Sequence, residues 1–103
     1  MTRRLEYATA AEEDLGAIAA YIAERSGERS VGEAYAAELR SRCKALAACP
    51  FILGRERDDC GEGRRSIAHD DYVIFFRAHA HLIRVIAILE GHQDVSPLVL
   101  ERR

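Results

Sequence analysis

One small domain is the most that 103 residues allow, and a composition of 49% hydrophobic and 31% charged residues excludes intrinsic disorder. The net charge of −2 argues against a broad nucleic-acid-binding surface, which would be clearly basic. No apolar run approaches the roughly 20 residues of a membrane span, and no signal-peptide pattern opens the chain. The sequence therefore predicts a single cytoplasmic domain over residues 1–103 that does not bind membranes.

The chain begins with the pattern of a short strand followed by a helix. Residues 3–7 alternate between apolar and charged side chains, which is typical of a strand with one buried face. Thr9 and Glu12 have the spacing of a capping box, so a helix is expected to begin there. Apolar residues follow at helical spacing, and Gly27 is expected to end the helix.

A second helix is predicted directly after the first. Ser30 and Glu33 repeat the capping-box spacing, and Pro50 is expected to stop the helix because the residue before a proline avoids helical geometry. Since few residues separate the two helices, they should pack as an antiparallel hairpin. Residues 51–63 are rich in glycine and aspartate and read as a loop.

The second half of the chain has the pattern of a β-meander. Short strands are expected at residues 65–67, 72–77 and 82–89, separated by turns at 70–71 and 78–81. The last strand is almost continuously apolar, which favours a central position in the sheet. The predicted fold class is therefore α+β, with the order β-α-α-β-β-β. A small antiparallel sheet would pack against an N-terminal helical hairpin, leaving its other face partly open.

Four arginines fall on the predicted strands: Arg64, Arg65, Arg77 and Arg84. Guanidinium groups suit bidentate contacts to carboxylates and phosphates. If these side chains converge on the open face, they form an anion site. If they alternate outward, they are solvated positions with ion pairs inside the sheet. The sequence leaves both alternatives open.

The histidines offer no clear catalytic or metal site. His79 and His81 would share one face of a strand, but no third ligand accompanies them, so solvated turn residues are favoured over a metal site. His92 follows a strand end and is either a general acid or base or a surface residue. The three cysteines lack C-x-x-C spacing and are expected to be reduced. No cofactor and no metal are predicted.

Segments spread over most of the chain carry a family resemblance. They are Glu13-Asp14-Leu15 with Ile18 and Tyr21-Ile22, Leu46 with Pro50 and Gly54-Arg55, Arg65-Ser66 with Tyr72-Val73-Ile74-Phe75-Phe76-Arg77, and Ile83, Val85 and Ile88-Leu89 with Gly91-His92-Gln93-Asp94. In order and spacing they resemble the ParE/RelE superfamily of bacterial toxins, and most closely its ParE branch, whose members are often labelled plasmid stabilisation proteins.

The resemblance implies the toxin of a type II toxin–antitoxin system. A cognate ParD-like antitoxin would wrap the toxin with its C-terminal segment, neutralise it and form a hetero-oligomer with it. ParE-like toxins are described as inhibitors of DNA gyrase, whereas RelE-like relatives cleave mRNA on the ribosome. A non-toxic module that only holds the antitoxin and co-represses its operon is a third alternative.

The charge of the chain decides the order of these alternatives. ParE-like chains often have Arg at the position of Ala87 and His at that of Glu90, and the nuclease branch is markedly basic, whereas this chain has Lys44 as its only lysine. A ribosome-bound nuclease approaches a dense phosphate field, for which a net negative charge is a handicap. Gyrase inhibition by protein binding, without enzymatic activity or direct nucleic-acid binding, is therefore ranked first and RNA cleavage second.

The resemblance also implies functional residues on the sheet and after its last strand. For RNA cleavage, the catalytic candidates are Arg65, Arg77 and His92. For binding of protein partners, the expected residues are Arg65, Tyr72, Arg77, Arg84, His92 and Asp94.

Overall fold

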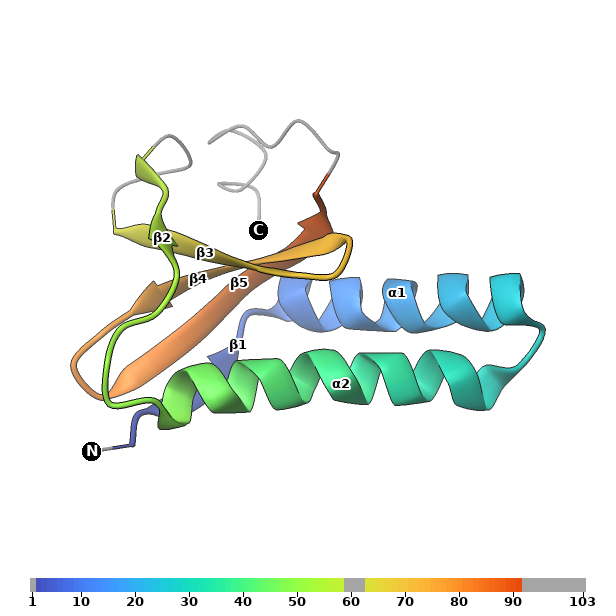
Figure 1. Ribbon diagram of the computed structural model, residues 1–103, viewed down its shortest axis with the longest axis horizontal. Helices are drawn as coiled ribbons and strands as arrows, with labels where there is room; N and C mark the ends of the chain where they lie inside the picture. Colours follow the sequence, from blue (N-terminus) through green and yellow to red (C-terminus); the bar gives the residue numbers. More distant parts are fainter. Residues whose placement is uncertain (1, 59–62, 92–103) are drawn as a thin grey trace.

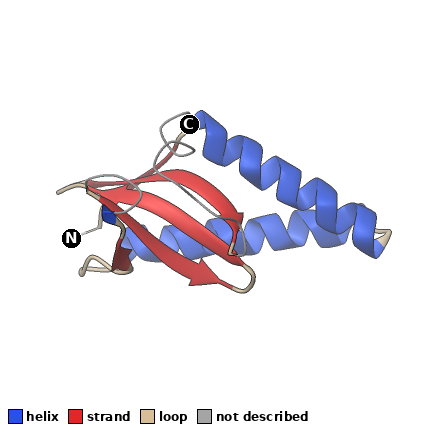
Figure 2. Ribbon diagram, turned by 90° about the horizontal axis from the view of Figure 1, so that it is seen from above, coloured by secondary structure: helices blue, strands red, loops and turns tan. Residues whose placement is uncertain are grey.

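The computed structural model describes residues 2–58 and 63–91, which form two helices and one five-stranded sheet (Figures 1 and 2). In chain order the elements are β1 (Arg4–Tyr7), α1 (Thr9–Ser26), α2 (Arg29–Ala48), β2 (Arg55–Glu56), β3 (Arg64–His69), β4 (Tyr72–Ala78) and β5 (Leu82–Glu90). The two helices form the predicted hairpin, and their connected end projects beyond the sheet (Figure 1). No helix in this described part combines the length and apolar character that a membrane crossing requires.

The strands lie in the order β1-β5-β4-β3-β2. Strands β2 to β5 pair antiparallel, whereas β1 pairs parallel with β5, so the sheet is mixed. A parallel pair needs a crossover, and the helical hairpin contributes to it. The predicted α+β class is confirmed, and β5 is an inner strand between β1 and β4, as its apolar run indicated; the sheet expected to be antiparallel is mixed because of β1. The two-residue strand β2 falls in the segment that was expected to be loop.

Both predicted capping boxes are wrong. Helix α1 already begins at Thr9 and α2 at Arg29, and neither N-cap residue makes a side-chain capping bond. The Ala8 amide still donates to Val85 O of β5 at 2.9 Å, so pairing with the sheet continues up to the residue before α1. The predicted stop at Gly27 is confirmed: its φ is 76°, and its amide donates to the Ala23 carbonyl.

The helix-facing side of the sheet, called the inner face here, carries the main core. Ile74, Phe76 and Val85 pack there against Leu15 and Leu39, and all five are almost completely buried. These side chains follow the alternation of the strands, so that every second residue of β4 points to the helices. The intervening residues of the same strands therefore point away from the helices.

The opposite side, called the outer face, is apolar over part of its area. Phe75, Ala87 and Leu89 form a second buried cluster there with Ile86. Phe75 pairs with Ala87 but Phe76 pairs with Val85, so Ile86 is an extra residue in a bulge of β5. The bulge lets two consecutive residues join the same cluster.

Candidate anion-binding site

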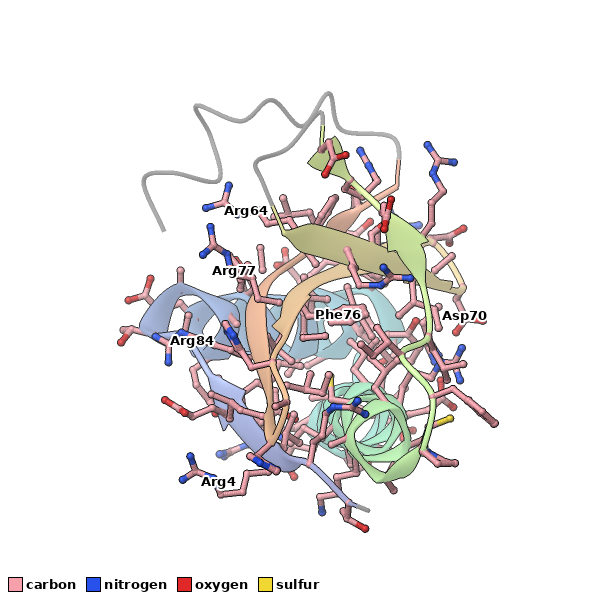
Figure 3. The ribbon with its side chains drawn as sticks, turned by 90° about the vertical axis from the view of Figure 1, so that its left-hand side faces the viewer. Arg4, Arg64, Asp70, Phe76, Arg77 and Arg84 are labelled. Atoms are coloured by element: carbon pink, nitrogen blue, oxygen red, sulfur yellow. The ribbon has the colours of Figure 1, made fainter. Side chains whose placement is uncertain are left out.

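Three arginines lie directly opposite one another across the outer face. The strand register pairs Arg64 of β3 with Arg77 of β4, and Arg77 with Arg84 of β5. Glu6 of β1 pairs with Arg84 and ends the row. Figure 3 shows the three labelled arginines on one side of the sheet and Phe76 on the other. Adjacent strands are about 4.8 Å apart, so the row spans about 10 Å. We call Arg64, Arg77 and Arg84 the arginine row.

The arginine row concentrates positive charge in a chain that is negative as a whole. Like charges directly opposite on neighbouring strands are destabilising. Arg84 is compensated, because its Nη1 lies 2.7 Å from Glu6 Oε1. Arg77, at the centre, has no ion-pair partner among residues 2–58 and 63–91. The Arg77 guanidinium, at the centre of the row, is therefore suited to binding an external anion.

A surface hollow of about 320 Å³ lies over the arginine row. Besides the three arginines, its lining contains Ala8, Ile86 and His79. His79 follows β4 in the predicted turn, two residues after Arg77, and is exposed. The expectation of a solvated turn residue is therefore correct, but the same residue also borders the arginine row, which the sequence did not indicate.

A fourth guanidinium group adds to the charge of the outer face. The Arg57 Nη1 donates to Ser66 Oγ at 3.2 Å. The Arg57 Cζ lies 5.2 Å from the centre of the Phe75 ring, in the range of a cation–π contact. Arg57 therefore lies over the apolar cluster and extends the positive surface beyond the arginine row.

Arg65 lies on the inner face, away from the arginine row. Its Nε donates to Leu53 O at 3.1 Å and its Nη2 to Gly54 O at 2.8 Å, and Glu56 forms a longer ion pair with it. The guanidinium group thus holds the segment before β2 against β3. Arg65 and Arg77, expected together as catalytic candidates, are on opposite faces of the sheet.

Tyr72 also belongs to the inner face. It is 8% exposed, and its ring centre lies 5.8 Å from that of Tyr35 on α2. Burial raises the pKa of the Tyr72 hydroxyl. Together with Tyr21, Asp14 and Glu90 it borders a second hollow, of about 270 Å³, between α1 and the ends of β4 and β5. Tyr72 therefore belongs to a different surface from Arg77 and Arg84.

The remaining predicted positions divide into two kinds. His92 and Asp94 lie outside the described residues. Within the described residues, Glu38, His69 and Asp70 are the one group with three potential metal-ligating side chains. His69 Nε2 lies 2.7 Å from Glu38 Oε2 and 3.6 Å from Asp70 Oδ2. These contacts join α2 to the β3–β4 turn.

The sequence missed part of this site for identifiable reasons. Arg64 was considered with the other strand arginines but was not selected as a partner-binding residue, although its place opposite Arg77 follows from the two-residue turn at positions 70–71. Glu6 was not considered, because only the unexpected parallel pairing of β1 brings it to Arg84.

Comparison with known proteins identifies the class of the chain as a toxin of a type II toxin–antitoxin system. Residues 5–95 match the family model described as "ParE toxin of type II toxin-antitoxin system, parDE". The chain therefore belongs to the ParE toxin family. A solved structure titled "Chromosomal ParDE TA system from P. aeruginosa" shares the fold, with a TM-score of 0.72 and 19% sequence identity, over 86% of this chain and 96% of that one. Curated proteins gave no match.

Proposed function

We propose that this toxin inhibits DNA gyrase by binding it in the cytoplasm and that a cognate ParD-like antitoxin neutralises it. The observation that carries the proposal is the match to the ParE family model over residues 5–95. In the wider superfamily, ParE-like toxins are described as gyrase inhibitors and RelE-like toxins as mRNA nucleases. This chain belongs to the ParE family. The proposal treats residues 1–103 as one toxin domain.

The outer face supports a role in protein binding. Arg77 and Arg84 are half-buried and lie on paired strands, which fixes their backbone positions, and Glu6 orients the Arg84 guanidinium. Arginine on a rigid scaffold binds carboxylates bidentately and is enriched at protein interfaces. We assign the contacts with partner carboxylates to these two residues. For Arg65 the observed bonds to the backbone favour a structural role.

His92 and Asp94, which follow β5 in the sequence, are proposed to contact the target of the toxin. Truncation of the chain after Leu89 removes both and should abolish toxicity while antitoxin binding partly survives. Growth after induction and calorimetric titration with the antitoxin measure the two properties separately. Toxicity that persists in the truncated chain would contradict the proposed role of His92 and Asp94.

RNA cleavage is the second candidate, and one observation favours it. His79 borders the same hollow as the arginine row. Cleavage of RNA needs a proton-transferring group beside positive charge that stabilises the phosphate. The sequence had suggested Arg65, Arg77 and His92 for this reaction. Arg65 lies on the other face and His92 lies outside the described residues, so this candidate function uses His79 with Arg77.

Induction of the toxin in growing bacteria distinguishes these functions. Gyrase inhibition predicts growth arrest with a DNA-damage response and intact mRNA, and co-expression of the antitoxin should restore growth. Arrest with mRNA cut in translated regions and without DNA damage would favour the nuclease. Growth without any arrest would contradict both and favour the co-repressor module.

A further inference from the structure

We infer that Glu38, His69 and Asp70 form a binding site for a divalent transition-metal ion, with zinc as the occupant. One ring nitrogen of His69 and one carboxylate oxygen from each acidic residue lie within 4.8 Å of one another. We call these three residues the α2–turn triad. The inference concerns the toxin alone and does not depend on its target or on its antitoxin.

Three different elements bring the ligand atoms of the α2–turn triad together. Glu38 lies on α2, His69 ends β3, and Asp70 begins the turn to β4. Glu38 is 31 residues from His69 in the sequence, so no metal-binding spacing is visible there. The His69 side chain is 20% exposed, whereas the carboxylate side chains of Glu38 and Asp70 are 55% and 62% exposed. An ion can therefore reach the triad from solvent.

The distances within the triad fit one shared zinc ion. Zinc binds nitrogen at about 2.0–2.1 Å and carboxylate oxygen at about 2.0–2.2 Å, so two ligand atoms on a tetrahedral zinc are roughly 3.4 Å apart. His69 Nε2 lies 2.7 Å from Glu38 Oε2 and 3.6 Å from Asp70 Oδ2. The ion replaces the hydrogen bond between His69 and Glu38, and the exposed Glu38 side chain needs to move by only about 0.7 Å to admit it.

The charges of the triad also favour a divalent cation. Each ionised carboxylate carries one negative charge. Among residues 2–58 and 63–91, Glu38 and Asp70 form ion pairs only with His69. A single imidazole, even when it is protonated, compensates one of these two charges. A divalent ion compensates both, and it leaves the imidazole in the neutral form that binds metals.

Tyr35 supports the triad from α2. Its hydroxyl donates to Asp70 Oδ2 at 2.9 Å, and its ring centre lies 6.2 Å from that of His69. Burial, together with the neighbouring Asp70 carboxylate, raises the pKa of the Tyr35 hydroxyl, so the hydroxyl remains a donor. Outer hydrogen bonds of this kind orient the carboxylates that ligate metals.

The donor set of the triad selects the ion. Imidazole suits zinc, copper, iron and nickel, whereas magnesium and calcium prefer sites made of oxygen alone. Zinc is often held by three protein ligands of the histidine and carboxylate type, with water in the fourth position. The triad supplies three such ligands. A bound zinc ion ties α2 to the β3–β4 turn and should therefore stabilise the fold.

Calorimetric titration of the metal-free full chain with zinc chloride tests the proposal. One zinc ion per chain should bind, and His69→Gln should weaken binding about tenfold or more, because one of three ligands is lost. His81→Gln is the matched control, since it removes an imidazole from an exposed turn position and should leave zinc binding unchanged. Tyr35→Phe keeps all three ligands but loses the outer hydrogen bond, and should weaken binding about tenfold.

Thermal unfolding separates loss of the site from loss of the fold. Zinc should raise the melting temperature of the wild type and of His81→Gln, but not that of His69→Gln. Asp70→Asn serves if His69→Gln does not fold. Asparagine tolerates the φ of 53° at this position but removes the charge of the carboxylate, so Asp70→Asn should fold and bind zinc about tenfold or more weakly than the wild type.

Four results would overturn the proposal: no zinc binding at submillimolar concentration, equal affinity in wild type, His69→Gln and Asp70→Asn, a loss in His81→Gln as large as in His69→Gln, or tighter binding of calcium than of zinc. The second and third would indicate adventitious binding by other side chains, and the fourth an oxygen site. Because these titrations contain neither gyrase nor antitoxin, their failure leaves gyrase inhibition untouched, and failed gyrase inhibition leaves the metal site untouched.

Discussion

Helix α2 lies close to the backbone of α1 at Gly32, and substitution of this residue tests how the hairpin is packed. A Cβ atom added at Gly32 would lie 2.1 Å from the Ala19 carbonyl oxygen and 3.0 Å from the Ala23 amide nitrogen. Both are backbone atoms of α1 and cannot rotate away. Replacement by alanine must therefore push α2 away from α1.

The expected loss follows from two opposing effects. Overpacking of this kind costs about 1–3 kcal/mol, and contact with backbone places Gly32→Ala at the upper end. Exchange of glycine for alanine in a helix returns about 1 kcal/mol of backbone entropy. The free energy of unfolding should therefore fall by about 2 kcal/mol, which for a domain of this size lowers the melting temperature by about 8–16 °C.

Gly16 is the matched control because it lies inside α1 with no atom within 4 Å of an added Cβ. Gly16→Ala should raise the free energy of unfolding by about 1 kcal/mol through helix propensity alone. Urea denaturation of both variants, followed by far-ultraviolet circular dichroism, measures both changes. If Gly32→Ala is as stable as Gly16→Ala, the close approach of the helices is refuted.

Three further predictions concern the core, Arg65 and an ion pair between the helices. Leu39→Ala removes a completely buried side chain and should lower the free energy of unfolding by about 2–5 kcal/mol in urea denaturation. Arg65→Gln loses two charge-assisted bonds to backbone carbonyls and should cost about 1–3 kcal/mol, whereas a change in toxicity without loss of stability would contradict its structural role. Arg40 hydrogen bonds hold the pKa of Glu12 below its usual 4.5. The pair therefore stabilises the fold above that pH and loses its effect as the pH falls through the lowered pKa. At pH 7 the free energy of unfolding of the wild type should exceed that of Glu12→Gln by roughly 0.2–1 kcal/mol, a small difference because the pair is exposed. The same difference in unfolding free energy at pH 3 would refute this account.

Local sequence patterns predicted those parts of the fold that local physics decides. The left-handed conformation at Gly27 and the apolar run of β5 were both recognisable because each depends on the residues themselves. The helix starts were mispredicted at Thr9 and Ser30, because strand pairing and the tight connection outweighed the capping preference. Tertiary context also decided the parallel pairing of β1.

The candidate site was predictable in its residue types and only partly in its geometry. The turn at Asp70 sets the register that pairs Arg64 with Arg77, and strand alternation then places Arg65 on the other face. The register of Arg84 depends on the turn after β4, and the bulge at Ile86 depends on packing in the outer cluster. Neither leaves a signature in a single sequence.

The most direct test of gyrase inhibition is a supercoiling assay with purified gyrase, relaxed plasmid and the refolded toxin, with and without the neighbouring antitoxin. The proposal predicts that the toxin blocks supercoiling in proportion to its concentration and that an equimolar amount of antitoxin restores it. Arg77→Gln should inhibit less than Arg29→Gln if the outer face contacts the enzyme. Full gyrase activity at a large excess of folded toxin would contradict the proposal, and cleavage of mRNA on translating ribosomes by the same preparation would replace it with the nuclease.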